Sequence, residues 1–331
     1  MTGPRLAPVL AFALAATLLA TPIVATSSLA QDYPAHPVRI IVPFGAGGPA
    51  DVTARLLGNA MQQSFGQPFV VENRTGAGGV IGTQEVVKSQ PDGYTLLMMS
   101  NTQTANESLM SAAQRKYDLM RDLVPIAPVN SSDLVIVVHP DVPARTLAEF
   151  IALAKSQPGK LNYASSGTGT PYHMAGELFK TMADIDVVHV PYRNSGDARA
   201  GVIGGQVQMM IDAVTTMAPN VAAGQVRALA TTGKTRSGVL PDVPTANEAG
   251  VPGYEATIWL GLMAPAGTPK PIIDKLNAAV NSLVKQADIV KLWKDQGAVP
   301  MSMTPEEFDK YLRGDILKWA DVVKRFPEKP Q

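Results

Sequence analysis

The sequence contains no cysteine, and this absence excludes several chemistries at once. Disulfide scaffolds, cysteine-ligated zinc sites, iron–sulfur clusters and thiol nucleophiles all require that residue. The chain also lacks an excess of charge, because its 28 Lys and Arg balance its 28 Asp and Glu, and it has no run of five or more basic residues. Since neutralising phosphates requires a basic face, nucleic acid is not expected as a partner.

What is present is typical of a globular protein. Apolar residues make up 46% of the 331 residues and charged residues 17%, which indicates a buried core rather than disorder. At about 100–200 residues per domain, this length suggests two domains. Beyond the first thirty residues, no apolar run is long enough to span a membrane.

The N-terminal segment has the pattern of a secretory signal peptide. Arg5 precedes an uncharged stretch rich in Leu and Ala at residues 6–19, and residues 28–30 form a small-x-small cleavage site. An uncleaved membrane anchor is the alternative, but it would require about 20 unbroken apolar residues. We therefore expect residues 1–30 to be a signal peptide that is removed on export, so that the mature chain begins at Gln31.

Short β-branched runs alternate with helical patterns through most of the mature chain. Such repeats predict an α/β fold with parallel sheets covered by helices on both faces. After residue 264 only helical patterns follow, and the last has Thr304 as its expected N-cap. The expected strands are residues 38–42, 69–71, 94–98, 134–138, 161–163, 187–190, 207–211 and 258–264, and the expected helices are residues 50–65, 81–88, 147–155, 172–182, 197–202, 269–284, 289–296 and 305–326.

Two breaks in this alternation suggest where the chain passes between domains. Residues 125–132 contain two prolines and a polar turn, and residues 250–253 read Gly-Val-Pro-Gly. If the chain crosses twice, one discontinuous domain comprises residues 31–130 plus 253–331, and the other comprises residues 131–252. A cleft between them would hold a ligand, as the strand ends of open α/β sheets do. One continuous sheet with a helical tail is the alternative.

Two glycine-rich loops follow expected strands and lead into helices. In the first, residues 43–49, the glycines let backbone N–H groups approach a ligand, and the helix N-terminus favours a carboxylate or a phosphate. The second, residues 74–79, is expected to be structural. Neither matches a dinucleotide fingerprint, since Ala50 and Ile81 occupy positions that require glycine.

Hydroxyl groups accompany the backbone donors in a third loop, residues 165–170, before a helix expected to open at Pro171. This combination suits a carboxylate or a sugar oxygen, whereas the alternative makes Thr170 an ordinary N-cap. In a fourth loop, Arg193 could pair with a carboxylate or could be a solvated surface charge. Asp212, after an apolar strand, is expected in a loop with turn chemistry.

No arrangement of residues in the sequence specifically predicts a catalytic site. The histidines His36, His139, His173 and His189 have no metal-ligand spacing, and no G-x-S-x-G elbow surrounds the loop serines. A pair formed by Ser166 and His173 is the catalytic alternative, although such a histidine is more often a satisfied helix residue.

Taken together, these segments resemble the Bug family, the solute receptors of tripartite tricarboxylate transporters. The resemblance runs in order over essentially the whole mature chain. The matching segments are VRIIVPF at 38–44, GAGG at 45–48 with Asp51, VENR at 71–74, GAGG at 76–79, PDGYTLL at 91–97, LNYASSG at 161–167, HVPY at 189–192, LPDVPT at 240–245 and APAGTP at 264–269.

This resemblance implies a two-lobed periplasmic-binding-protein fold of type II (Venus flytrap), with two α/β domains and a hinge. It implies a periplasmic monomer that closes on a small organic carboxylate and delivers it to the integral membrane subunits of a transporter. No cofactor, metal or covalent chemistry is expected. A periplasmic sensor that presents the ligand-bound form to a signalling partner is the alternative, and a serine-dependent hydrolase is a further one.

In that family, the loops after the first strands of the two lobes hold one carboxylate, largely through backbone groups and ordered water, and more variable positions set specificity. Family members often carry Lys-Gly after the Val-Pro-Tyr segment, where this sequence has Arg193-Asn194, and a guanidinium there would favour a second carboxylate on the solute. Asn101 and Thr102 are expected in a loop. Carried over to this sequence, the ligand-binding residues are Phe44, Ala46, Gly47, Gly48, Asn101, Thr102, Ser166, Gly167, Thr168, Thr170, Tyr192, Arg193, Asn194, Ser195 and Asp212.

Overall fold

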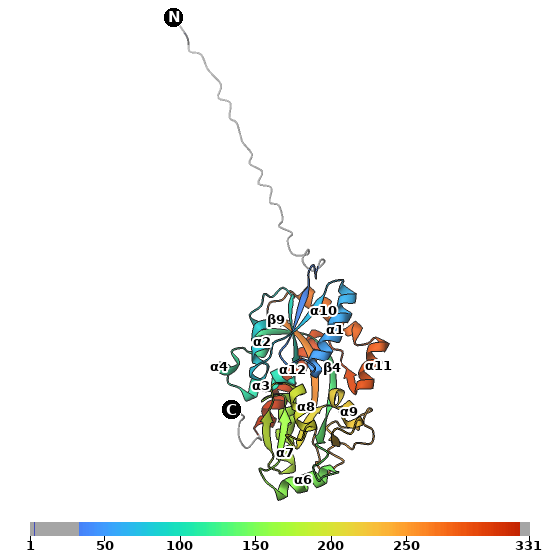
Figure 1. Cartoon of the computed structure of the whole chain (residues 1–331). Coiled ribbons are helices and arrows are strands. Elements are labelled where there is room, and N and C mark those ends of the chain that lie inside the picture. Colours follow the sequence, from blue (N-terminus) through green and yellow to red (C-terminus); the bar gives the residue numbers. More distant parts are fainter. Residues whose placement is uncertain (1–2, 4–32, 325–331) are drawn as a thin grey trace. The chain divides into compact units, whose positions relative to one another are not determined.

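The computed structural model describes residue 3 and residues 33–324, and the described residues from Pro34 onward belong to one compact unit (Figure 1). The expected signal peptide, residues 1–30, lies outside the described residues apart from Gly3.

Strands and helices alternate through this unit as the sequence predicts, which confirms the α/β class. The strands are β1 (Val38–Val42), β2 (Phe69–Asn73), β3 (Thr95–Ser100), β4 (Leu123–Val138), β5 (Asn162–Ser165), β6 (Val188–Pro191), β7 (Met209–Ala213), β8 (Arg227–Thr231), β9 (Thr257–Pro265) and β10 (Ala298–Pro300). The helices are α1 (Pro49–Phe65), the 3₁₀ turn η1 (Ala77–Gly79), α2 (Val80–Val87), α3 (Asn101–Leu109), α4 (Ala112–Arg115), α5 (Leu119–Asp122), α6 (Leu147–Ser156), α7 (Pro171–Ala183), α8 (Ser195–Ile203), α9 (Val214–Ala222), α10 (Lys270–Leu283), α11 (Ala287–Gln296) and α12 (Pro305–Val323).

The strands form two groups that share β4. In the first group β2, β1 and β3 are parallel, and β9 runs antiparallel between β3 and β4, which also pairs with β10. In the second group β6, β5 and β7 are parallel, and the last residues of β4 pair antiparallel with β7 and β8. Helices α1, α2 and α10 lie around the first group and α6 to α9 around the second (Figure 1).

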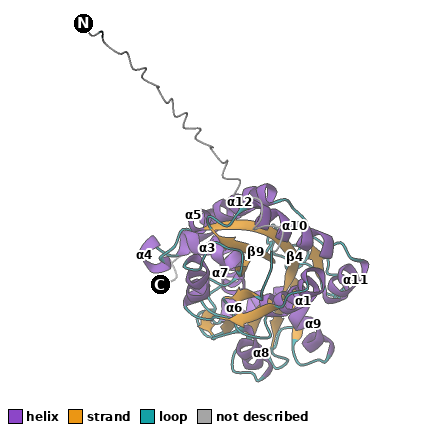
Figure 2. Ribbon diagram, turned by 90° about the horizontal axis from the view of Figure 1, so that it is seen from above, coloured by secondary structure: helices purple, strands orange, loops and turns teal. Residues whose placement is uncertain are grey.

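β4 passes from one group to the other without a break. Its residues from Leu123 to Asp133 pair with β9, and those from Leu134 to Val138 pair with β7. β4 and β9 therefore lie side by side in the middle of the helices (Figure 2).

The course of β4 corrects one expectation. Residues 125–132, interpreted as a break with two prolines and a polar turn, form no turn and lie inside this strand. The prolines fit because the pairing with β9 shifts register between Pro125 and Ala127 and again between Pro128 and Asn130. Such irregularities remove ladder positions that require an N–H group, which proline lacks.

Each strand group has its own apolar core. In the first, Ile41 and Met99 pack with Trp259 and Phe308, whose rings meet edge to face at 5.8 Å. The second core joins residues of β4, β7, α8 and α9, among them Val135, Met210, Val202 and Met217. Because these side chains leave little room for movement, the cores hold the loops at the strand ends in fixed positions.

Helix ends follow the sequence signals where those are strong. Thr304 caps α12 as predicted, accepting a hydrogen bond from the Glu307 N–H at 3.1 Å. The same kind of signal also starts α3, which the sequence reading missed. There Ser100 and Gln103 form a capping box, so Asn101 and Thr102 occupy the first turn of a helix rather than a loop.

Helix α9 and strand β8 also were not predicted from the sequence. Among the described residues, no helix combines the length and the apolar character needed to cross a membrane.

Candidate ligand-binding site

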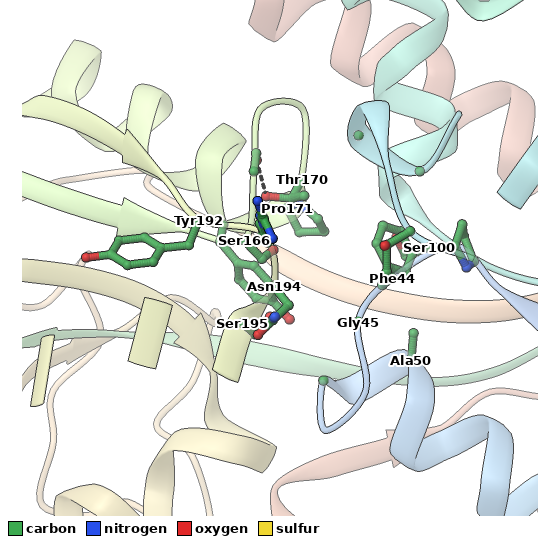
Figure 3. Close-up of a pocket in the computed structure, with 18 of the residues that line it drawn as sticks. Phe44, Gly45, Ala50, Ser100, Ser166, Thr170, Pro171, Tyr192, Asn194 and Ser195 are labelled. Atoms are coloured by element: carbon green, nitrogen blue, oxygen red, sulfur yellow. Dashed lines mark hydrogen bonds between the residues drawn. The ribbon is translucent and has the colours of Figure 1, made fainter. Parts of the chain in front are cut away.

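A cavity of about 500 Å³ lies where loops from the two strand groups face one another. Figure 3 shows Phe44, Gly45 and Ser100 on one side of it, opposite Ser166, Thr170 and Asn194. The lining residues come from the β1–α1 and β2–α2 loops, from the ends of β3 and β9, and from the β5–α7 and β6–α8 loops; they are Pro43, Phe44, Gly45, Gly48, Pro49, Ala50, Thr75, Gly76, Ala77, Gly78, Gly79, Ser100, Ile258, Ser166, Gly167, Thr170, Pro171, Tyr172, Tyr192, Arg193, Asn194 and Ser195.

Two helices begin at the cavity without a side chain capping them. Neither Gly48 before α1 nor Thr170 before α7 forms a side-chain cap hydrogen bond, and a proline occupies the first helical position in each. The N–H groups of a first helical turn have no partner within the helix, and the helix dipole adds positive potential there. Two such ends at one cavity favour a bound anion.

The β1–α1 loop is held from behind by a buried carboxylate. Asp51 accepts a hydrogen bond from the Gly47 N–H at 3.0 Å and pairs with Arg55 at 2.9 Å. Asn73 donates to the carbonyl of Phe44 at 3.0 Å. Burial by itself would raise the pKa of Asp51, but the hydrogen bonds from Arg55 and Gly47 outweigh it and lower that pKa. The carboxylate therefore stays ionised and fixes the loop.

The β5–α7 loop presents a free hydroxyl group to the cavity. Thr170 donates its hydroxyl to the Gly167 carbonyl at 2.7 Å. Ser166, half-buried at the cavity, has no hydrogen-bond partner for its hydroxyl among the described residues. A solute that reaches Ser166 would therefore meet a donor that no protein group occupies.

Charge at the cavity has one sign. Of the described residues that line it, Arg193 alone carries a charge, and none is acidic. Arg193 is exposed and forms no ion pair with a described residue. Since the guanidinium of Arg193 is the one charged group among the described lining residues, the cavity attracts anions and does not repel them.

The structure brings most of the predicted site residues to this cavity. Those that line it are Phe44, Gly48, Ser166, Gly167, Thr170, Tyr192, Arg193, Asn194 and Ser195. Those that do not line it are Ala46, Gly47, Asn101, Thr102, Thr168 and Asp212.

The residues outside the lining have other partners. The N–H of Gly47 is taken by Asp51, and the Asn101 side chain donates to the Thr257 carbonyl at 2.9 Å. Thr102 is fully buried in the first turn of α3. Thr168 lines a separate small cavity instead.

Asp212 was expected in a loop, and this expectation is wrong. It lies within β7, fully buried, and forms an ion pair with Arg199 at 3.0 Å. Burial raises the pKa of Asp212, and Arg199 acts against that shift. The pair serves the packing of α8 on β7 rather than the cavity.

Sequence reasoning left out part of the lining. Gly76 to Gly79, expected to be structural, form one wall, and Ser100 and Ile258 were not considered as contacts. One signal was available, because residues 45–48 and 76–79 share the sequence Gly-Ala-Gly-Gly. Because these segments follow β1 and β2, which are neighbouring parallel strands, both loops lie at the same edge of the sheet.

Backbone contacts across the rim bring the two sides together. A Cβ atom at Gly78 would lie 2.8 Å from the carbonyl oxygen of Thr168, and one at Gly169 would lie 2.8 Å from Asn106 Oδ1. Glycine at both positions permits that approach, so the β5–α7 loop closes this rim of the cavity against the β2–α2 loop and helix α3.

The structure does not form the hydrogen-bonded pair of Ser166 and His173 that the catalytic alternative requires. Nδ1 of His173 accepts a hydrogen bond from the Gly169 N–H, and Ser166 bonds to no histidine. A different pair does form, Ser165 Oγ with His189 Nε2 at 2.6 Å, but Ser165 is fully buried and away from the lining. No serine of the described loops thus presents an activated hydroxyl to the cavity.

A family model and a curated relative both match most of this chain. A family model described as "Tripartite tricarboxylate transporter family receptor" matches residues 53–327. Protein BugT of Bordetella pertussis is 38% identical over 306 residues, covering 92% of this chain and 94% of that protein.

Solved structures share the fold at similar identity. The structure described as "R. palustris Rpa4515 with adipate" superposes with a TM-score of 0.86 at 32% identity, covering 89% of this chain and 98% of that one. The periplasmic binding protein BugD gives 0.84 at 33% identity, with 88% and 98% covered. MatC from Rhodopseudomonas palustris with bound malate gives 0.83 at 33% identity, with 88% and 99% covered. These matches confirm the predicted two-lobed periplasmic-binding-protein fold.

Proposed function

This chain belongs to the tripartite tricarboxylate transporter receptor family, and we propose that it captures a small organic carboxylate in the cavity between its two strand groups. The observation that carries this proposal is the pair of uncapped helix N-termini, α1 and α7, at a cavity whose lining contains no acidic side chain. The bound adipate of Rpa4515 and the bound malate of MatC support it, since both are carboxylates held by proteins of the same fold.

The residues proposed to contact the solute are the predicted ones that line the cavity. Backbone groups near Gly48 and Gly167 would hold one carboxylate, together with the free hydroxyl of Ser166. Arg193 at the edge would recognise a second anionic group, because a guanidinium pairs with a carboxylate in a planar, two-bond geometry. The protein would bind and release the solute unchanged.

Binding would proceed by closure of two lobes about a hinge. The proposed lobes comprise residues 31–130 plus 253–331 and residues 131–252, joined by β4 and by the chain that returns at β9. Since the solute would touch loops of both lobes, only the closed form makes all the contacts, and the solute therefore shifts the population towards it.

Export and delivery complete the proposed role. Residues 1–30 would direct the chain to the periplasm and be removed there. The closed, solute-loaded monomer would then dock on the integral membrane subunits of a tripartite transporter and open to release the solute.

A thermal-shift screen tests the binding step directly. The mature protein is heated with mono-, di- and tricarboxylates, with amino acids and with aromatic acids, and hits are measured by calorimetry. A solute at 100 times its Kd adds about 2.7 kcal/mol to the free energy of unfolding, which raises Tm by several degrees. Matched alcohols and amides, in which the carboxylate is replaced, serve as controls and should give no shift.

Two outcomes would contradict the proposal. One is that no carboxylate shifts Tm while a neutral or cationic compound does. The other is that a carboxylate or its ester is consumed with turnover that Ser166→Ala abolishes, which would assign the cavity to an enzyme instead.

A further inference from the structure

Two histidines lie directly behind the β5–α7 loop without lining the cavity. His173, 3% exposed, belongs to the first turn of α7, and His189 lies on the neighbouring strand β6. Their rings pack against each other with centroids 4.3 Å apart. Neither is a candidate to touch the solute, yet both hydrogen-bond to the loop that does.

His173 holds the C-terminal part of the loop. Its Nδ1 accepts a hydrogen bond from the Gly169 N–H at 3.2 Å. Gly169 has a φ of +80°, a backbone conformation that needs glycine and that this bond stabilises. A nitrogen that accepts from an N–H cannot carry a proton itself, so the bond exists only with Nδ1 unprotonated.

His189 holds the N-terminal part of the same loop. Its Nε2 lies 2.6 Å from Ser165 Oγ, and that hydroxyl is bonded to both the N–H and the carbonyl of Gly167, at 3.1 and 3.2 Å. The ring also stacks on Tyr163, with centroids 4.9 Å apart. Since His173 packs on this ring, the orientation of each imidazole depends on the other.

The loop that these two attachments hold carries the solute-facing groups. Ser166, Gly167 and Thr170 line the cavity, and Thr170 is tied to Gly167 through its hydroxyl. We propose that His173 is a positioning residue for solute binding, which acts through the Gly169 N–H to fix the β5–α7 loop in its binding geometry. This inference rests on the proposed function, because it concerns the same cavity.

The surroundings keep His173 in the state that the bond requires. Burial lowers the pKa of His173 to about 4, and the positive Lys180 acts in the same direction. Lys180 is itself held by Glu177 at 3.0 Å, and Glu177 accepts a hydrogen bond from the Tyr163 hydroxyl. At neutral pH the imidazole is therefore uncharged and able to accept.

A matched pair of substitutions separates positioning from packing. His173→Asn and His173→Leu branch alike at Cγ, but asparagine places an oxygen near the Nδ1 position and leucine offers no acceptor. With the carboxylate that gives the largest thermal shift as the probe, we expect His173→Leu to raise the Kd about three- to tenfold, and His173→Asn to stay within about twofold of the parent protein. The amide of Gly169, followed by NMR hydrogen exchange without solute, should exchange faster in the leucine variant alone.

The outcomes of these measurements decide between positioning and packing. Equal weakening of binding by both variants, with unchanged Gly169 exchange, would reduce His173 to a packing residue and overturn the inference. Should His173→Leu fail to fold, the ¹⁵N shift of Nδ1 in the parent protein decides, since a protonated Nδ1 at pH 7 is incompatible with the bond. If the parent protein binds no carboxylate, the proposed function fails, and Gly169 exchange still tests the contact itself.

Discussion

Gly45 and Asn194 meet across the mouth of the cavity. A Cβ atom at position 45 would lie 2.5 Å from Asn194 Cβ, closer than real Cβ atoms approach another heavy atom. Gly45 belongs to the β1–α1 loop and Asn194 caps α8, so the two come from different strand groups. The absence of a side chain at position 45 is therefore what allows the closed arrangement at this point.

Gly45→Ala should hold the cavity open and weaken solute binding. Gly45 does not have a left-handed φ, so alanine brings no backbone strain and the effect comes from the contact alone. We expect the Kd to rise about tenfold or more, which corresponds to about 1.4 kcal/mol, with the Tm of the solute-free protein unchanged. Calorimetry gives the Kd, and small-angle scattering with saturating solute gives the degree of closure.

The partner of Gly45 supplies the rescue experiment. Asn194→Gly removes the Cβ that alanine would strike, and glycine is nearly as good an N-cap as asparagine, within a few tenths of a kcal/mol. The double variant should bind within about threefold of Asn194→Gly alone. Gly238→Ala, where no atom lies within 4 Å of the new Cβ, is the control for a glycine-to-alanine change. Normal affinity in Gly45→Ala would show that closure does not use this contact.

Arg193→Gln should discriminate solutes by their number of anionic groups. If the guanidinium pairs with a second carboxylate, adipate loses affinity in the variant by about three- to tenfold, whereas hexanoate, with the same chain length and one carboxylate, changes by less than about twofold. Arg193 is exposed, so the difference should shrink as salt is raised. Equal effects on both acids would mean that the side chain points to solvent.

Removing the hydroxyl groups of Ser166 and Thr170, which line the cavity, should reduce affinity for two different reasons. Ser166 has a free hydroxyl at the cavity, whereas the Thr170 hydroxyl is bonded to Gly167. We expect the Ser166→Ala, Thr170→Ala double variant to lose about 1–3 kcal/mol of binding free energy. Ser166→Ala alone should leave the solute-free Tm unchanged, and Thr170→Ala should lower it. Unchanged affinity in the double variant would withdraw both residues from the site.

The sequence predicts the fold better than it predicts which side chains reach the cavity. Alternating patterns identify β1, α1, β5 and α7 because burial imposes a period on the chain. Asp212 shows the limit: an aspartate after an apolar run is typical of a turn, and only the three-dimensional position of Arg199 makes it a buried partner. That pairing depends on how α8 packs on β7, which no local pattern encodes.

The direction of each backbone N–H group is a second property that the sequence does not encode. Gly47 and Gly48 are adjacent in one glycine loop, yet Gly48 lines the cavity and the Gly47 N–H turns back to Asp51. A glycine-rich sequence predicts that N–H groups are accessible, but not which way each one points. The missed helix α3 is different, because the sequence contains a recognisable capping-box pattern at Ser100 and Gln103.

Acid should destabilise the fold through His173 and His189. Burial lowers the pKa of His173 to about 4 and that of His189 to about 3, whereas both titrate near 6.5 in the unfolded chain. Between those values the unfolded state binds protons that the folded state does not. The free energy of unfolding therefore falls as pH drops below about 6.5, and for His173 the loss is about 1.4 kcal/mol per pH unit until pH 4.

The test is urea unfolding from pH 7.5 to 4.5 of the parent protein and of His173→Asn. The groups that face His173, namely His189, Tyr163, Glu177 and Lys180, are the same in both proteins. So are the carboxyl groups of Asp133, Asp212 and Asp315, whose raised pKa values act in the opposite direction. The difference between the two stability curves therefore reports the titration of His173 together with its effect on His189, whose pKa His173 also lowers. We expect the parent protein to lose stability relative to the variant as pH falls through this window. Parallel curves would mean that the pKa of His173 is the same in the folded and the unfolded protein, and folding would then not protect the imidazole that accepts from Gly169 against protonation below about pH 6.5.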